Sequence, residues 1–260
     1  MSAAGPALEQ GLADLGLALQ AGQRDQCLAY LTLIGKWNQV YNLTAVRQPE
    51  QMLTHHLLDC LAALAPLQRH LAQAGLAQGG RLLDVGSGAG LPGIVWAIGC
   101  PQLQVCCVDT VAKKAAFITQ AAQTLGLKNL KGVHARVESL NGPFDVISSR
   151  AFASLPDFVA GSAQALEAGG VWLAMKGKHP AQEIAAVQPG VDVFHVEPLQ
   201  VPGLSAERCI VWMRPRPAQL DGSPGGFCGP HGLVPGAGCC HEGRAQTCCV
   251  VWAPVSRETA

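Results

Sequence analysis

The chain has 260 residues, a net charge of zero, 49% hydrophobic residues and 14% charged residues. This composition supports a sizeable buried core and argues against disorder over most of the length. No run of eighteen apolar residues occurs, and residues 1–10 lack the pattern of a secretory signal, so we expect neither a membrane span nor secretion. A neutral chain is also poorly equipped to bind nucleic acid through bulk charge alone.

Helices are predicted for the N-terminal part of the chain. Apolar residues recur at helical spacing over residues 8–19 and again over residues 31–41. A third helix is expected to begin at Pro49 and to run through residues 52–64 until Pro66 ends it.

From residue 81 onward, short apolar runs alternate with segments of helical spacing, a rhythm typical of a parallel α/β sheet. The predicted strands are 82–85, 103–108, 130–137, 144–148, 171–175, 191–196 and 209–213, and the predicted helices among them are 91–98, 112–125, 156–167 and 180–187. We therefore predict a doubly wound, mostly parallel sheet.

These patterns divide the chain into a helical cap (1–75), an α/β domain (76–216) and an extension rich in Gly and Pro (217–260). We expect the extension to be disordered. It holds five cysteines and two histidines but no CxxC pair, which argues against a zinc site. The other six cysteines fall within apolar patterns and are expected to be buried thiols in a reducing cytoplasm.

A glycine-rich turn follows the first predicted strand. Gly86, Gly88 and Gly90 let the backbone approach a ligand, and the helix start behind them offers free N–H groups. Asp109 ends the next strand, where a carboxylate accepts hydrogen bonds from the hydroxyls of an adenosine ribose. Together these residues predict a cofactor that contains a nucleoside.

The turn alone leaves the cofactor ambiguous, because its glycine spacing also satisfies the dinucleotide-binding fingerprint. Asp84, just before the glycines, suits the ammonium of a methionyl group and would repel a pyrophosphate. This favours S-adenosyl-L-methionine as the cofactor, while an NAD-dependent oxidoreductase stays open as an alternative.

Several further blocks resemble the bacterial small-subunit (16S) rRNA guanine-N7 methyltransferases, the RsmG or GidB family. The blocks occur in the family's order and span residues 8 to 214. They are Lys36-Trp37-Asn38, Tyr41-Asn42-Leu43-Thr44, His56-Leu57-Leu58-Asp59, the Asp84–Gly93 turn, Ser148-Ser149-Arg150-Ala151-Phe152-Ala153, Met175-Lys176-Gly177, and Val201-Pro202-Gly203-Leu204 before Glu207-Arg208. Such a set is much more specific than a single glycine turn.

The resemblance implies a Rossmann-like class I S-adenosylmethionine-dependent methyltransferase sheet with an N-terminal helical cap. It also implies that Gly86 and Leu91 line the cofactor, that Val137 and Glu138 bracket its adenine, and that Arg150 closes the site. Arg150 follows the fourth strand, and its guanidinium can hold a cofactor carboxylate or an RNA phosphate with two hydrogen bonds. We expect Arg150→Ala to abolish methyl transfer while leaving the fold intact.

The implied reaction is methyl transfer to N7 of a specific guanine in 16S rRNA. Residues 149–152 contain neither the Asn or Asp with two prolines common in exocyclic amine methylation nor a cysteine for covalent attack. Guanine N7 carries no proton, so its methylation needs positioning and desolvation rather than a general base.

The RNA itself is expected to meet a local basic stretch. Between Asp109 and Glu138 no residue is acidic, and the basic residues there are Lys113, Lys114, Lys128, Lys131 and Arg136. Lys113, Lys114 and Arg136 are candidate phosphate contacts. His56 is a further candidate, although its helical spacing with Asp59 favours a structural role.

The expected partner is 16S rRNA within the small ribosomal subunit, with no role for DNA or a membrane, and we expect a cytoplasmic monomer. Trp37 and Tyr41 have the chemistry to stack on a base, but their helical spacing more often indicates core. A third possible function is a non-catalytic module that binds adenosylmethionine and docks on RNA.

Overall fold

A computed structural model describes residues 4–216 of the chain. The predictions for residues 217–260, a disordered extension without zinc, lie outside the described residues. Within the described part, no helix is long and apolar enough to cross a membrane.

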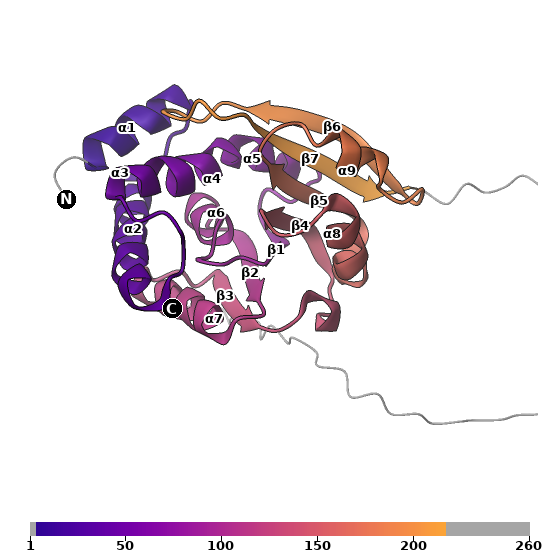
Figure 1. The fold of residues 1–260 in the computed structure, drawn as a ribbon, viewed down its shortest axis with the longest axis horizontal. Helices are drawn as coiled ribbons and strands as arrows, with labels where there is room; N and C mark the ends of the chain where they lie inside the picture. The colour runs from indigo at the N-terminus through magenta and orange to yellow at the C-terminus, as the bar shows by residue number, and fades with distance from the viewer. Residues whose placement is uncertain (1–3, 217–260) are drawn as a thin grey trace, which may run out of the picture. The chain divides into compact units, whose positions relative to one another are not determined.

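Helical segments make up the N-terminal part of the described chain (Figure 1). They are α1 (Ala4–Asp14), α2 (Ala21–Tyr41), α3 (Pro49–Met52), the π-helical turn η1 (Leu53–Leu58), α4 (Asp59–Ala62) and α5 (Leu64–Gln73). The prediction that Pro66 ends a helix is wrong. The break lies at Ala63, and Pro66 occupies the first turn of α5, where a backbone N–H has no helical acceptor to lose.

The rest of the described chain builds a seven-stranded sheet in the order β3-β2-β1-β4-β5-β7-β6. The strands are β1 (Gly80–Val85), β2 (Leu103–Asp109), β3 (Leu130–His134), β4 (Phe144–Arg150), β5 (Leu166–Lys176), β6 (Val191–Leu199) and β7 (Arg208–Pro215). Strands β1 to β5 pair in parallel, and β7 is antiparallel to both of its neighbours. The predicted doubly wound, mostly parallel sheet is confirmed.

Two predicted boundaries near the site are wrong. The third strand stops at His134 rather than Val137, because its partner β2 ends opposite it at Asp109, and the chain then turns into a short 3-10 helix, η2 (Val137–Ser139). The helix expected over 156–167 is α8 (Leu155–Ser162), followed by η3 (Ala163–Ala165) and the start of β5.

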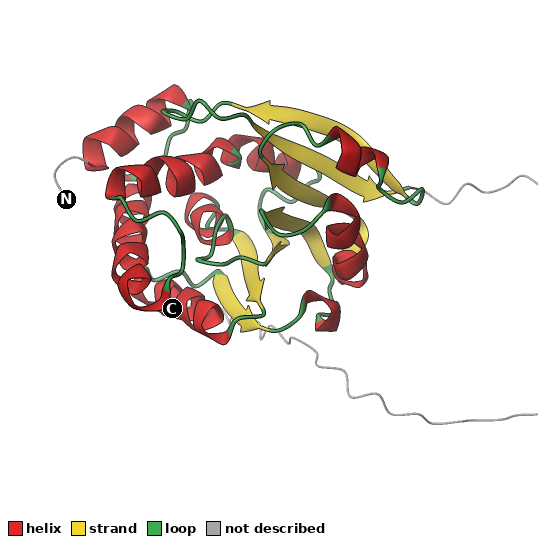
Figure 2. Cartoon of the chain, viewed as in Figure 1, coloured by secondary structure: helices red, strands yellow, loops and turns green. Residues whose placement is uncertain are grey.

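Helices cover both faces of the sheet (Figure 2). Neighbouring strand residues such as Leu82 and Leu83 point to opposite faces and join different buried clusters. The first cluster contains side chains of α6 (Gly93–Gly99), α7 (Ala112–Thr124) and the N-terminal helices, whereas the second contains those of α8. A further short helix, α9 (Ala181–Ala185), precedes β6.

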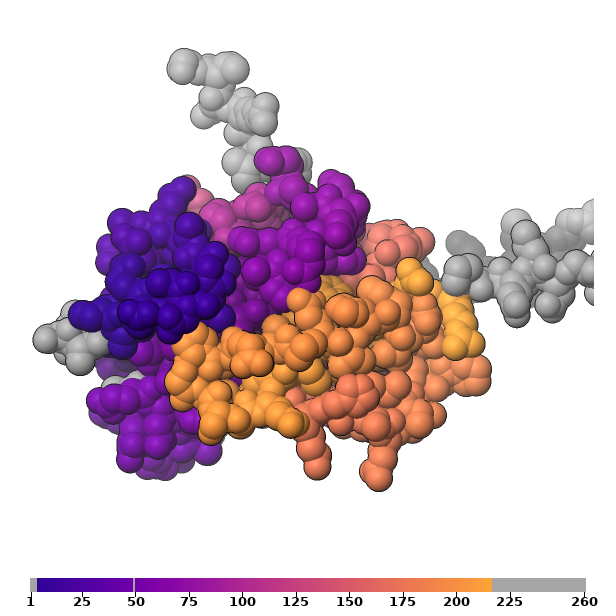
Figure 3. Space-filling view, turned by 90° about the horizontal axis from the view of Figure 1, so that it is seen from above, coloured from indigo at the N-terminus to yellow at the C-terminus, as the bar shows by residue number. Residues whose placement is uncertain are grey.

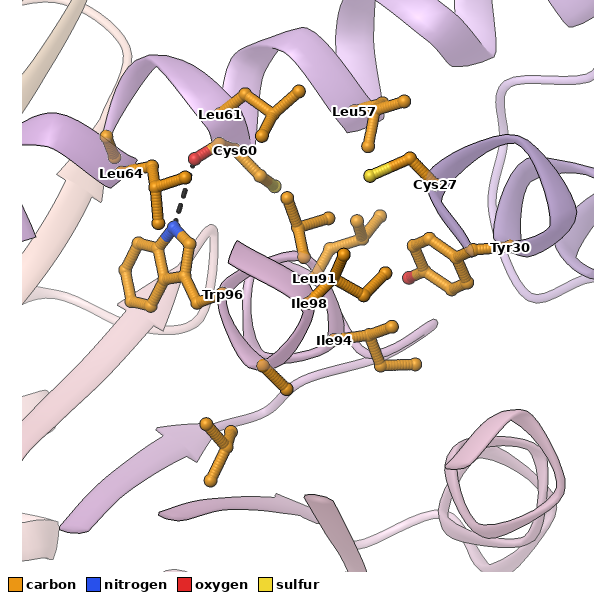
Figure 4. Close-up of a cluster of buried hydrophobic side chains, with 14 of the residues drawn as sticks. Cys27, Tyr30, Leu57, Cys60, Leu61, Leu64, Leu91, Ile94, Trp96 and Ile98 are labelled. Atoms are coloured by element: carbon orange, nitrogen blue, oxygen red, sulfur yellow. Dashed lines mark hydrogen bonds between the residues drawn. The ribbon is translucent and has the colours of Figure 1, made fainter. Parts of the chain in front are cut away.

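The N-terminal helices pack directly on the glycine-rich turn and α6 (Figure 4). The buried Tyr30 hydroxyl on α2 donates a 2.6 Å hydrogen bond to the Ala89 carbonyl in the turn. The Trp96 indole on α6 donates a 3.0 Å bond to the Cys60 carbonyl on α4. These bonds satisfy polar groups that would otherwise be buried alone, so they fix the position of the turn.

The same helices also contact the C-terminal strands, and Figure 3 shows the indigo N-terminal segment against the orange segment that carries β6 and β7. Arg69 on α5 forms a 2.7 Å ion pair with Glu197 on β6. Asp59 on α4 forms a 2.8 Å ion pair with Arg208 at the start of β7.

The six cysteines of the described part are buried free thiols, as predicted. Burial raises the pKa of Cys106 to about 11 and that of Cys27 to about 12, so both side chains are protonated small hydrophobes at neutral pH.

Gly93, the first residue of α6, allows this helix to approach the sheet closely. A Cβ at this position would overlap Cys107 Sγ and lie 3.0 Å from Asp84 Oδ2, both of which are buried. We expect Gly93→Ala to lower the free energy of unfolding by about 1–3 kcal/mol through overpacking.

The matched control is Gly35→Ala in the middle of α2, where an added Cβ meets nothing within 4 Å. This change should be neutral or stabilise the protein by up to about 1 kcal/mol. Urea denaturation of the two variants measures both effects, and equal stabilities would contradict the close approach at Gly93.

Candidate functional site

A cavity of about 380 Å³ lies at the carboxyl ends of the central strands. Its wall includes the last residues of β1 and β2, the segment that follows β3, and Ala151 and Phe152 after β4. Ligands of open α/β sheets bind at this edge, and the volume is in the range of small-molecule sites.

The cavity brings together Gly86, Asp109, Val137 and Glu138 from the predicted cofactor residues. The other predicted residues, Asp84, Gly88, Gly90, Leu91 and Arg150, do not line it. Leu91 is buried in the core that faces the N-terminal helices, so it supports the turn from behind.

Val137 and Glu138 belong to η2 and reach the cavity from the side of β3. Val137 is buried and provides apolar wall, whereas the Glu138 side chain is exposed. The backbone carbonyl of Glu138 accepts a hydrogen bond from the Gln164 side chain, which fixes η2 against η3.

Asp84 is completely buried in the structure. Its Oδ2 accepts a 3.1 Å hydrogen bond from the Gly93 N–H, and its Oδ1 accepts one of 3.1 Å from the Ser148 hydroxyl. Burial raises the pKa of Asp84 to about 6, although these hydrogen bonds act in the opposite direction. The carboxylate therefore joins β1, α6 and β4, whereas the sequence suggested direct contact with an ammonium group.

Asp109 borders the cavity and also holds its rim in place. Its Oδ2 accepts a 2.9 Å hydrogen bond from the Gly88 N–H, and its Oδ1 accepts a 2.8 Å bond from the Val111 N–H. Lys114 lies 3.9 Å from the same carboxylate. The glycine-rich turn is thus tied to the start of α7.

The amides of the glycine-rich turn are used within the protein. The N–H groups of Gly86 and Ser87 donate to the Val108 carbonyl, and that of Gly88 donates to Asp109. Those of Gly90 and Leu91 donate to the Ser87 carbonyl. A phosphate-binding turn points such amides at its anion, so this arrangement is unsuited to a pyrophosphate.

Phe152 is a cavity residue that sequence reasoning gave no role. It is 45% exposed, and a Cβ on Gly86 would overlap its ring. The residue before it, Ala151, has a positive φ of 52°, which L-residues other than Asn and Asp seldom adopt. Its place directly after β4 was a usable signal, because side chains at that edge face the ligand region.

Arg150 lies beside the cavity wall but is engaged by the N-terminal helices. Its NH1 group donates to Asp59 Oδ2 at 2.9 Å and to the His55 carbonyl at 3.0 Å. Asp59, only 3% exposed, also binds Arg208. The expectation that Arg150→Ala leaves the fold intact is therefore corrected: removing Arg150 would disturb this buried network and is expected to lower stability as well as activity.

The predicted RNA contacts divide into accessible and buried residues. Lys114 and Arg136 line the cavity, and Lys113 is exposed at the start of α7. His56 is only 6% exposed, and its Nε2 lies 2.8 Å from the Thr44 hydroxyl. The proposed RNA contact of His56 is therefore corrected to the structural role that its helical spacing favoured.

Residues 23–211 match the family model described as "rRNA small subunit methyltransferase G" (GidB). The chain belongs to this family. Among curated relatives, the ribosomal RNA small subunit methyltransferase G of Acidovorax sp. (strain JS42) is 66% identical over 213 residues, which cover 80% of this chain and 94% of that protein. The protein of the same name from Paracidovorax citrulli is 64% identical over 225 residues, covering 84% and 93%.

Solved structures are less similar to this family member. A SAM dependent methyltransferase from Aquifex aeolicus has a TM-score of 0.46 and 18% identity, covering 59% of this chain and 91% of that chain. The resemblance to the RsmG or GidB family is thus confirmed by the family match and the curated relatives.

His56 should make the stability of this methyltransferase family member depend on pH. Burial, assisted by the positive charge of Arg150, lowers the pKa of His56 from 6.5 to about 4. Between pH 6.5 and about pH 4, His56 is therefore protonated in the unfolded chain but neutral in the folded chain. The stabilisation present at pH 8 is lost as the pH falls, by about 2 kcal/mol at pH 5.

The measurement compares the wild type with His56→Gln by urea denaturation at both pH values. The stability difference between the two proteins should shrink by that amount at pH 5. A difference that is equal at pH 8 and pH 5 would show that His56 titrates normally in the folded protein.

Proposed function

We propose that this chain transfers a methyl group from S-adenosyl-L-methionine to N7 of a specific guanine in the 16S rRNA of the small ribosomal subunit. The observation that carries this proposal is the family match over residues 23–211. The named relatives act, by their names, on small-subunit ribosomal RNA. Because that substrate is a ribosomal particle, the proposed compartment is the cytoplasm.

The cavity residues fit such a cofactor. Asp109 provides a carboxylate for ribose hydroxyls, and Val108 and Val137 provide apolar wall for an adenine ring. Gly86 lets the Phe152 ring lie close against the turn, because a Cβ at this position would overlap the ring. We infer that Gly86, Asp109, Val137 and Glu138 contact the cofactor, and that Asp84, Gly88, Gly90 and Leu91 shape the turn that presents it.

The NAD-dependent alternative is disfavoured by the turn. A dinucleotide needs free amides at the helix start for its pyrophosphate, and here the amides of Gly88, Gly90 and Leu91 are committed to internal acceptors. An uncharged or cationic group at the same place demands no such donors. This observation supports adenosylmethionine.

The proposed mechanism requires no general acid or base from the protein. When bound, the cofactor supplies a methyl carbon on a positively charged sulfur. Guanine N7 has a lone pair and carries no proton, so the protein would have to orient this atom towards that methyl carbon but would not have to remove a proton. The chain's residues would orient the base, exclude water and hold the cofactor, with Phe152 forming the exposed wall beside the reacting groups.

Methyl transfer is tested with radiolabelled adenosylmethionine and small subunits from a strain that lacks the modification. We expect label on one guanine of 16S rRNA. Methylation at N7 gives that base a positive charge, which mild alkaline treatment should remove by opening the imidazole ring. Thermal shifts with adenosylmethionine but not with NAD would support the cofactor. Adenosylmethionine binding without transfer to the subunit would instead favour the non-catalytic docking module.

Asp109→Ala should weaken adenosylmethionine binding by about 1.5–3 kcal/mol, because hydrogen bonds to an ionised group are lost together with the anchor of the turn. Isothermal titration measures this change. Asp25→Ala is the matched control, since Asp25 is exposed near the start of α2, away from the cavity. Equal affinities of both variants would contradict the role of Asp109.

A further inference from the structure

Two segments without acidic residues pack against each other in this neutral protein. One is 26–49, between Asp25 and Glu50, and the other is 110–137, between Asp109 and Glu138. Their basic residues are Lys36, Arg47, Lys113, Lys114, Lys128, Lys131 and Arg136. Both segments therefore carry net positive charge, although the whole chain is neutral.

Two contacts show that the chain runs in opposite directions along helices α2 and α7. Near one end of the pair, the Gln26 side chain donates a 2.8 Å hydrogen bond to the Leu125 carbonyl. Towards the other end, the rings of Trp37 and Phe117 lie 5.3 Å apart at 65°. The carboxyl end of α2 is thus beside the amino end of α7.

An exposed aromatic ring marks this end of the pair. Tyr41, the last residue of α2, is 40% exposed, and its ring centroid lies 5.0 Å from that of the half-buried Trp37. Because Trp37 is wedged against Phe117, the Tyr41 ring is held by a fixed partner. Val40 beside it is 70% exposed, so apolar surface is left uncovered here.

The exposed ring lies at the end of the helix pair that also carries Lys113. Tyr41 is one helical turn beyond Trp37, and Lys113 is one turn before Phe117, so the antiparallel packing brings them to the same end. The next residue, Lys114, lines the cavity. Lys128 follows the opposite end of α7, about 18 Å away along a helix of this length.

We propose that Val40, Tyr41 and Lys113, here called the Tyr41 surface, bind the RNA strand that flanks the target guanine. Tyr41 stacks on an unpaired base, and Lys113 contacts a phosphate. Exposed aromatics beside lysines are the usual means of holding unpaired RNA, since every base offers a flat face. This inference rests on the function proposed above and names the substrate contact of that site.

A protein partner would also cover exposed apolar side chains. The charge pattern favours RNA, because segments 26–49 and 110–137 carry basic and no acidic residues, and because Lys114, next to Lys113, lines the cavity. The sequence alone favoured a core role for Trp37 and Tyr41. In the structure Trp37 is packed on α7, whereas Tyr41 leaves part of its ring in solvent.

The test measures the binding of small subunits and of protein-free 16S rRNA directly, without methyl transfer. Tyr41→Ala should weaken binding to both about tenfold, and Tyr41→Phe, which keeps the ring, should bind as the wild type does. Lys113→Glu should weaken binding at least as much, with a reduced salt dependence. Lys128→Glu makes the same charge change at the far end of α7 and should bind as the wild type does.

Adenosylmethionine affinity should be unchanged in the Tyr41 variants, and far-ultraviolet circular dichroism confirms that each variant is folded. Wild-type binding by folded Tyr41→Ala and Lys113→Glu would overturn the inference. So would an effect of Tyr41→Ala seen with subunits but absent with protein-free rRNA, because a ribosomal protein would then be the partner. Binding without methyl transfer by the wild type would contradict the proposed function alone.

Discussion

The candidate site depends on a buried carboxylate that its ligand need not touch. Both carboxylate oxygens of Asp84 accept hydrogen bonds from the protein. The donors are the Gly93 N–H at the start of α6 and the Ser148 hydroxyl on β4. Burial of this group is unfavourable, as its raised pKa of about 6 records, and the two hydrogen bonds offset part of the cost. The same hydrogen bonds fix the turn between β1 and α6 to the neighbouring strand β4, so the turn that borders the cavity is held in one position.

The opposite side of the turn is fixed by the N-terminal helices. Tyr30 binds the turn at Ala89, while Asp59 binds Arg150 at the end of β4 and Arg208 on β7. One acidic residue between two guanidinium groups from distant segments holds the helices on the sheet more specifically than apolar contact alone. The cap and the sheet edge therefore form a single support for the cavity.

The sequence predicted the sheet well because its physics is local. Strands buried on both faces appear as short apolar runs, and the glycine-rich turn has a distinctive composition. The family blocks also identified the region of the site. The sequence could not separate residues that face the cavity, such as Gly86 and Asp109, from residues that support them. Asp84 and Leu91 belong to the same motif as Gly86, and a motif does not show which of its side chains face the ligand.

The same distinction explains the errors. Proline is compatible with the end of a helical pattern and with the first turn of a new helix, so Pro66 alone does not locate the break, which lies at Ala63. The position of Phe152 after β4 pointed to the site, but the sequence does not show the positive φ of Ala151 or the close approach of the ring to Gly86 that place this side chain at the cavity.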